Sequence, residues 1–169
     1  NDAVGDLVQS LDAINNIINH YGNNQILIYL SERSKNFNFL FNFNNVKVNI
    51  LNYDLTILEK IKLLYSLLKD NIETVYILTP KKFYYYLPLL FKKIKFYALC
   101  INSKNNYKRP SNFLRKYLYK FVINERDKDF KRKSTMQLQR ELTNDLAFSK
   151  KYKIFNIPSF KCKNLPDLK

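Results

Sequence analysis

The 169-residue sequence has few of the residues from which common nucleotide and metal sites are built. It has only two glycines, Gly5 and Gly22, so it contains neither a Gly-x-Gly-x-x-Gly fingerprint nor a P-loop, the turns that cradle phosphates. Its two cysteines, Cys100 and Cys162, lack the spacing of a zinc site, and His20 is the single histidine. We therefore expect no metal, no cofactor and no disulfide framework, and a reducing, cytoplasmic location.

Long apolar runs are also missing. No stretch reaches the length of a membrane-spanning helix and no signal peptide is seen, so we expect a chain that does not cross a bilayer. An apolar content of 46% is enough for one domain with a hydrophobic core. Attachment to the inner-membrane surface stays open as an alternative.

Acidic residues are scarce in the second half of the chain. Residues 1–79 hold 6 basic and 8 acidic side chains, whereas residues 80–169 hold 23 basic and 6 acidic ones. The first part therefore has a net charge of −2 and the second a net charge of +17. Such a field attracts nucleic acid, anionic lipid headgroups or a phosphorylated saccharide, although a solvated lysine-rich surface explains it equally well.

The hydrophobic pattern alternates between strand and helix along the chain. Compact apolar runs predict strands at residues 25–30, 46–51, 74–78, 96–101 and 121–123. Helical spacing predicts helices at residues 4–21, 55–69, 81–94, 111–119 and 134–148, with a short one near 34–43. In the helix 55–69, we expect the face with Ile57, Leu58, Ile61, Leu64 and Leu68 to be apolar, Asp54 to be the cap, and Pro88 to kink the helix 81–94.

This alternation predicts an α/β fold, a Rossmann-like parallel sheet with helices on both faces. An intact domain of this class would have a buried strand just before the first helix, but the sequence opens at Asn1 directly into that helix. We therefore expect the first strand to be missing and the chain to be a fragment.

Val4-Gly5-Asp6 stands at the start of the first helix. In a doubly wound sheet, ligands bind beyond the carboxyl ends of the strands, where the helices begin, and Asp6 would project there. Gly5 permits a tight turn and a close approach of ligand to the backbone. On these residues alone, a helix-capping Asp6 is the simpler interpretation.

The opening Asn1–Ile14 (NDAVGDLVQSLDAI) resembles the opening of glycosyltransferase family 9, the heptosyltransferases of lipopolysaccharide core synthesis. That family begins with a strand, a small polar loop, a hydrophobic residue, Gly-Asp and a helix with a Leu-Pro-Ala-like segment. Here Leu11-Asp12-Ala13 has Asp in place of the usual Pro. Residues 70–79, 104–124 and 134–142 resemble later family segments at lower specificity.

The resemblance implies the N-terminal, acceptor-binding half of a GT-B fold, whose C-terminal half binds the nucleotide-sugar donor. Such enzymes invert the anomeric carbon without a required metal, and the Gly-Asp carboxylate is the general base. By residue matching, Asp6 is catalytic, and Asp2, Ala3 and Gly5 line the acceptor loop. A carboxylate within about 3 Å of a sugar hydroxyl would contribute roughly 10²–10⁴-fold.

The acceptors of this family are phosphorylated or acidic saccharides on lipid A, so basic groups are expected at the cleft. Lys81 and Lys82 follow the carboxyl end of a predicted strand, and Arg109 lies in a loop that matches a basic position of the family. All three are predicted to bind the acceptor. Solvated surface cations are the alternative. The aromatic run 83–86 could stack on sugar, but aromatics on a helix more often fill a core.

We therefore predict an acceptor-binding domain at residues 1–149, truncated at its N-terminus, and a linker or tail at 150–169 toward an absent donor domain. The predicted function is transfer of a heptose-like sugar from a nucleotide-sugar to a lipopolysaccharide-core acceptor, with this chain inactive alone. The expected partners are a saccharide or glycolipid acceptor, the donor domain and an anionic membrane surface, without specific nucleic acid. The alternatives are a basic nucleic-acid-binding α/β domain and a degenerate, non-catalytic remnant.

Overall fold

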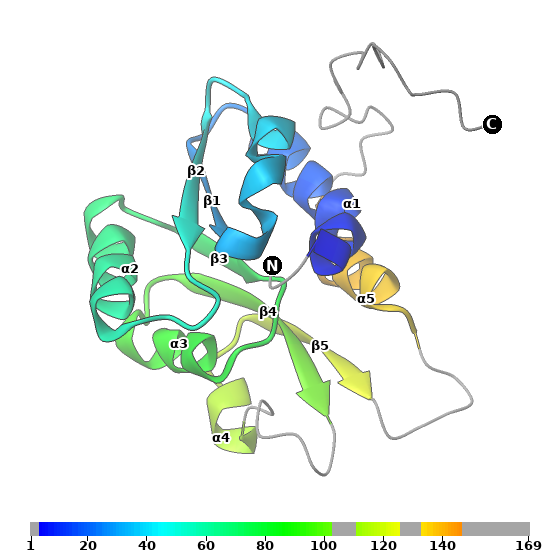
Figure 1. The fold of residues 1–169 in the computed structure, drawn as a ribbon. Helices are drawn as coiled ribbons and strands as arrows, with labels where there is room; N and C mark the ends of the chain where they lie inside the picture. The colour runs from blue at the N-terminus through cyan, green and yellow to red at the C-terminus, as the bar shows by residue number, and fades with distance from the viewer. Residues whose placement is uncertain (1–3, 103–110, 126–132, 147–169) are drawn as a thin grey trace, which may run out of the picture.

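Strands and helices alternate along the chain, as the sequence predicts, over the residues that the computed structural model describes, 4–102, 111–125 and 133–146 (Figure 1). The described strands are β1 (Ile26–Ser31), β2 (Val46–Leu51), β3 (Thr74–Ile77), β4 (Lys95–Asn102) and β5 (Lys120–Glu125). The α-helices are α1 (Val4–His20), α2 (Ile57–Lys69), α3 (Leu87–Leu90), α4 (Asn112–Arg115) and α5 (Thr135–Leu142), and η1 (Glu32–Phe41) and η2 (Lys82–Tyr86) are 3₁₀ helices.

All strand pairs are parallel, but they form two sheets. β1 pairs with β2 from Ile26 opposite Val46 to Ser31 opposite Leu51. β4 lies between β3 and β5 in a separate sheet of three strands. The predicted parallel α/β architecture is therefore confirmed, while the expected single sheet is divided between β1 and β3.

Helices cover both faces of the three-stranded sheet, as predicted. Phe96, Ala98 and Cys100 of β4 are buried in one core cluster together with residues of α2, η2, α3 and α4. Leu99 points to the opposite face, where it packs with Leu138 and Leu142 of α5. This alternation follows from the two-residue period of a strand whose two faces are both buried.

α1 packs on the β1–β2 side and is tied to the other sheet through α5. Leu7, Ile14 and Ile18 of α1 share a core with Leu30 of β1 and Phe41 of η1. α5 lies beside α1 (Figure 1), and Arg140 of α5 donates from Nε to Asp12 Oδ2 over 2.8 Å. Asp12, which stands where the resembled family has Pro, thus forms an ion pair between the two helices.

The cap of α2 differs from the prediction. Thr56, not Asp54, caps this helix: its hydroxyl accepts from the Glu59 backbone N–H over 3.2 Å. The Glu59 carboxylate in return accepts from the Thr56 N–H over 2.9 Å. This reciprocal capping box satisfies two backbone donors at the start of the helix, and Asp54 lies two residues before the cap position.

The buried face of α2 was also predicted wrongly. The structure buries Leu63 and Leu67, and Leu64 is half-buried. The other residues of the expected apolar face are exposed: Ile57, Leu58, Ile61 and Leu68. Apolar side chains occupy most of the circumference of α2, so the sequence does not decide which side faces the sheet.

The predicted helix 81–94 is split. Residues 82–86 form the 3₁₀ helix η2, and Pro88 occupies the first turn of the short helix α3. Proline has no N–H to donate, so it is tolerated in the first turn of a helix, and here the 3₁₀ helix η2 passes directly into α3 at Leu87. The predicted helix 111–119 is likewise shortened to α4, and α5 ends at Leu142 with Thr143 as its cap.

Candidate functional site

Asp6 lies in the first turn of α1 and is half-buried. Its backbone carbonyl accepts from the Ser10 hydroxyl over 2.7 Å. Ser10 in turn accepts from Gln139 Nε2 over 2.9 Å, and the same amide donates to the carbonyl of Leu78, the residue after β3, also over 2.9 Å. Ser10 therefore lies at the carboxyl end of β3, and Asp6 lies one helical turn beyond it, at the edge where parallel α/β sheets bind ligands.

Gly5 precedes Asp6 within the same helical turn. It does not have a positive φ, and a Cβ built on it would meet nothing within 4 Å. Nothing in the described fold therefore requires glycine at this position, and the space beside the backbone is open. Asp2, Ala3 and Arg109, three further predicted site residues, lie outside the described residues.

Lys81 is anchored to the loop that follows β2. Its Nζ donates to the Tyr53 carbonyl and lies 4.4 Å from the centre of the Tyr53 ring. Lys81 is half-buried, while Lys82, at the start of η2, is exposed. The two predicted acceptor-binding lysines thus differ, because only Lys81 has a position fixed by these contacts to Tyr53.

Arg33 was not predicted as a site residue, yet it contacts the same ring. Its guanidinium carbon lies 3.7 Å from the centre of the Tyr53 ring. We call Arg33, Tyr53 and Lys81 the basic cluster. Each of the three follows a different parallel strand, β1, β2 or β3, within a few residues of its carboxyl end.

Two cations on one aromatic ring form a site that can attract an anion. The face of an aromatic ring attracts cations, and a guanidinium can hold a phosphate or carboxylate through two parallel hydrogen bonds. Arg33 is exposed, so its guanidinium edge is accessible to solvent. The basic cluster and Asp6 lie at the same, carboxyl edge of the parallel strands.

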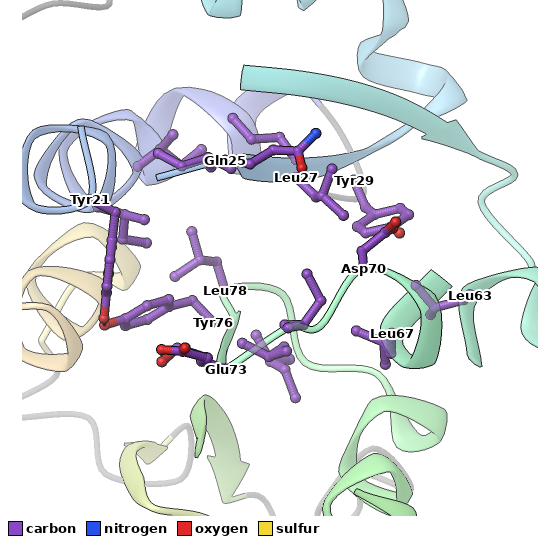
Figure 2. A pocket seen from close by; sticks show the side chains of 18 of the residues that line it. Tyr21, Gln25, Leu27, Tyr29, Leu63, Leu67, Asp70, Glu73, Tyr76 and Leu78 are labelled. Atoms are coloured by element: carbon purple, nitrogen blue, oxygen red, sulfur yellow. The ribbon is translucent and has the colours of Figure 1, made fainter. Parts of the chain in front are cut away.

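A partly open cavity of about 440 Å³ lies elsewhere, between β1 and β3 (Figure 2). Leu27 of β1 lines one side and Leu78 the other, with Leu63 and Leu67 of α2 beside them. Neither Asp6 nor Arg33 lines this cavity. It separates the two sheets and is distinct from the site at their edge.

The aromatic run after Lys82 belongs mainly to the core. Tyr85 is 1% exposed, and its hydroxyl donates to the Leu99 carbonyl over 2.8 Å. Burial raises the pKa of Tyr85 well above its ordinary value, and burial also raises the pKa of the neighbouring Cys100 thiol to about 11. The preferred core interpretation is confirmed for Tyr85, and Cys100 is an unreactive core residue.

Residues 4–102, 111–125 and 133–146 contain no group of three or more His, Cys, Asp or Glu side chains that could hold a metal ion. Within the same residues, every helix is too short or too polar to reach across a membrane.

Comparison of the chain with protein-family models, with curated proteins and with solved structures gave no match. The resemblance to glycosyltransferase family 9 therefore rests on the residues that carry it, chiefly Asn1–Ile14.

Proposed function

We propose that this chain is the acceptor-binding half of an inverting glycosyltransferase of GT-B architecture, with Asp6 as the general base. The observation that carries the proposal is the position of Asp6, a half-buried residue in the first turn of α1, one turn beyond the carboxyl end of β3. That is where an α/β sheet offers its ligand site, and it is the place of the Gly-Asp base in the resembled family.

In the proposed reaction, the acceptor hydroxyl oxygen attacks the anomeric carbon of a nucleotide-sugar. The bond from that carbon to the nucleotide phosphate breaks, the nucleotide leaves with the bonding electrons, and Asp6 takes the hydroxyl proton. A positioned carboxylate of this kind contributes roughly 10²–10⁴-fold to the rate. The donor would be bound by a second domain, so these residues alone are expected to show no transfer.

The basic cluster supplies the second part of the proposal, which is recognition of a phosphorylated or acidic saccharide such as a lipopolysaccharide core. Arg33 would grip a phosphate in a two-pronged contact, and Lys81 would add a fixed positive charge beside it. Lys82 and Arg109 remain predicted acceptor contacts, as do Asp2 and Ala3. Glycolipid acceptors would bring the protein to an anionic membrane surface.

Binding can be tested on the chain itself. Deacylated, phosphorylated lipopolysaccharide core would be titrated and followed by calorimetry and by amide chemical shifts near Asp6 and Arg33. Arg33→Ala should weaken binding by about tenfold, because a charge-assisted hydrogen bond is lost. Lys92→Ala, which removes an exposed cation away from this edge, is the matched control. Equal affinity of the two variants would argue against the basic cluster as an acceptor site.

Catalysis must be tested in a protein that also contains the donor domain. Asp6→Asn should lower turnover by about 10²-fold or more while acceptor binding persists. Asp54→Asn, which changes an exposed carboxylate in the loop after β2, should leave turnover unchanged. Near-normal turnover of Asp6→Asn would reduce Asp6 to a residue that stabilises the start of α1.

A second candidate function, nonspecific binding of single-stranded nucleic acid, is favoured by a different surface. Four exposed aromatic side chains lie close together in sequence among basic residues around α4 and β5: Phe113, Tyr117, Tyr119 and Phe121. Exposed rings among cations are a stacking surface for bases. Such binding should weaken steeply between two salt concentrations, whereas saccharide binding at Arg33 should weaken less.

A further inference from the structure

The two sheets face each other across the cavity with strand edges that are not paired. In the described residues β1 pairs with β2 alone, and β3 with β4 alone. The cavity is lined along its length by residues 25–30 on the β1 side and 72–78 on the β3 side. The unpaired edges of β1 and β3 therefore face the same cavity, and a β-strand needs such backbone N–H and C=O groups on its two sides.

Apolar side chains of two helices line this space, one helix on each face of the sheets. Ile14, Ile17 and Ile18 of α1 line it, and so do Leu63 and Leu67 of α2, seen beside the cavity in Figure 2. Tyr29 of β1 is hydrogen-bonded to Ser66 of α2, so α2 is held against the β1 edge. A strand between β1 and β3 would have apolar side chains above and below it, and it would itself have to be apolar on both faces.

The direction of α1 fits a strand that leads directly into it. After α1 the chain turns at residues 21–25 and enters β1, so α1 runs opposite to β1. The contact of Ser10 with Gln139, which also binds the Leu78 carbonyl, puts the first turn of α1 past the carboxyl end of β3. A strand parallel to β1 and β3 would end at that edge, a short turn away from Val4.

We propose that the groove between β1 and β3 accepts an extended segment of this same polypeptide, joined ahead of α1, as a parallel strand. The segment would be about six residues long, as β1 is, and rich in valine, isoleucine or leucine on both faces. It would unite the two sheets in the order β2-β1-segment-β3-β4-β5. The inference rests on the edges and the cavity and is independent of the proposed glycosyl transfer.

The test extends the chain ahead of Asn1 by six residues of alternating valine and isoleucine. The matched control has the same extension with prolines at its third and fifth positions, which remove the N–H groups that a strand must donate. Amide hydrogen exchange of residues 26–31 and 74–77 is measured by NMR for both proteins and for the unextended chain. The valine–isoleucine extension should slow exchange at both edges by about tenfold or more, with the proline extension close to the unextended chain.

Cross-strand nuclear Overhauser effects from the extension to both β1 and β3 are expected in the parallel register. Equal protection by the two extensions would mean nonspecific apolar contact and would overturn the proposal. Protection that grows with protein concentration, together with dimers in sedimentation, would identify a second copy as the occupant and would also overturn it. Should the extended chain precipitate, the same six-residue sequence is added as a separate peptide to the unextended chain, and protection of only one edge or of neither counts against the proposal.

Discussion

β4 and β1 have similar apolar sequences, but the fold buries them to different depths. Phe96, Ala98 and Cys100 of β4 are 0% exposed, and β4 has a hydrogen-bonded neighbour on each side. In β1, residues 26–29 are half-buried, and burial is reached only at Leu30 and Ser31. Burial of a strand therefore depends on the presence of both neighbours as much as on its own hydrophobicity.

The largest expected effect is the difference between a leucine-to-alanine substitution in β4 and the same substitution in β1. Leu99→Ala in β4 should lower the free energy of unfolding by about 2–5 kcal/mol, because Leu99 is 1% exposed and its loss leaves a cavity. Leu27→Ala in β1 should cost about 1 kcal/mol, since Leu27 is half-buried and already borders a cavity. Urea unfolding of both variants measures the difference.

Equal losses for the two variants would contradict the contrast between the sheets. The same two substitutions can also be measured in the chain extended by the valine–isoleucine segment. There the cost of Leu27→Ala should rise toward that of Leu99→Ala, because a neighbouring strand would bury the side chain more fully.

A smaller effect is expected at the link between the two sheets. Gln139 is 1% exposed, and its amide bonds both Ser10 of α1 and the Leu78 carbonyl. Gln139→Ala should cost about 1–3 kcal/mol in the free energy of unfolding, since the Leu78 carbonyl loses this buried donor. Gln9→Ala, an exposed position on α1, serves as the control and should stay within about 0.5 kcal/mol of the unmodified protein.

The start of α2 should respond less strongly. Thr56→Ala is expected to cost about 1 kcal/mol in the free energy of unfolding, the usual loss on removing a helix cap. Asp54→Ala should change stability by less than about 0.5 kcal/mol, because Asp54 is exposed and does not cap the helix. A larger loss of stability for Asp54→Ala than for Thr56→Ala in thermal or urea unfolding would mean that Asp54 caps the helix.

The order of strands and helices could be predicted from the sequence because alternating segments such as residues 46–51 have the two-residue period of a strand, whereas residues 4–21 have helical spacing. The cap of α2 could also have been found, since Thr56 and Glu59 have the spacing of a capping box. The side of α2 that packs on the sheet could not be predicted from the sequence. Leu63 and Leu58 are equally apolar, and only the position of the sheet distinguishes them. Pro88 predicts an irregularity in the helix 81–94, but the sequence does not show where the next helical turn begins.

The candidate site was predictable only in part. Asp6 could be proposed because a single helix start and a family-like motif coincide there. The basic cluster could not be predicted from the sequence. Arg33, Tyr53 and Lys81 come from three separate segments of the chain, and they meet only because β1, β2 and β3 end at one edge. A cation shortly after a predicted strand is the signal that the sequence offers, and Arg33 has it as well as Lys81.

The smallest expected effect is the pH dependence of the α2 capping box. Hydrogen bonds from the backbone N–H groups of Asn52, at 2.9 Å, and Thr56 lower the pKa of Glu59 from 4.5 to about 2. A folded-state pKa below the unfolded value means that ionised Glu59 stabilises the fold fully above pH 4.5, and that this contribution is lost as the pH falls toward 2. The contribution should be small because the carboxylate is exposed to solvent.

Glu59→Gln isolates this contribution, because it removes the titrating group but keeps an acceptor for the same N–H donors. The difference in free energy of unfolding between the unmodified protein and Glu59→Gln should be constant above pH 4.5 and should shrink between pH 4.5 and about 2. NMR titration of the Glu59 carboxyl gives the folded pKa directly. A difference that does not change with pH would mean that Glu59 holds the start of α2 only as a neutral hydrogen-bond acceptor, and that the loop from β2 into α2 does not depend on its charge.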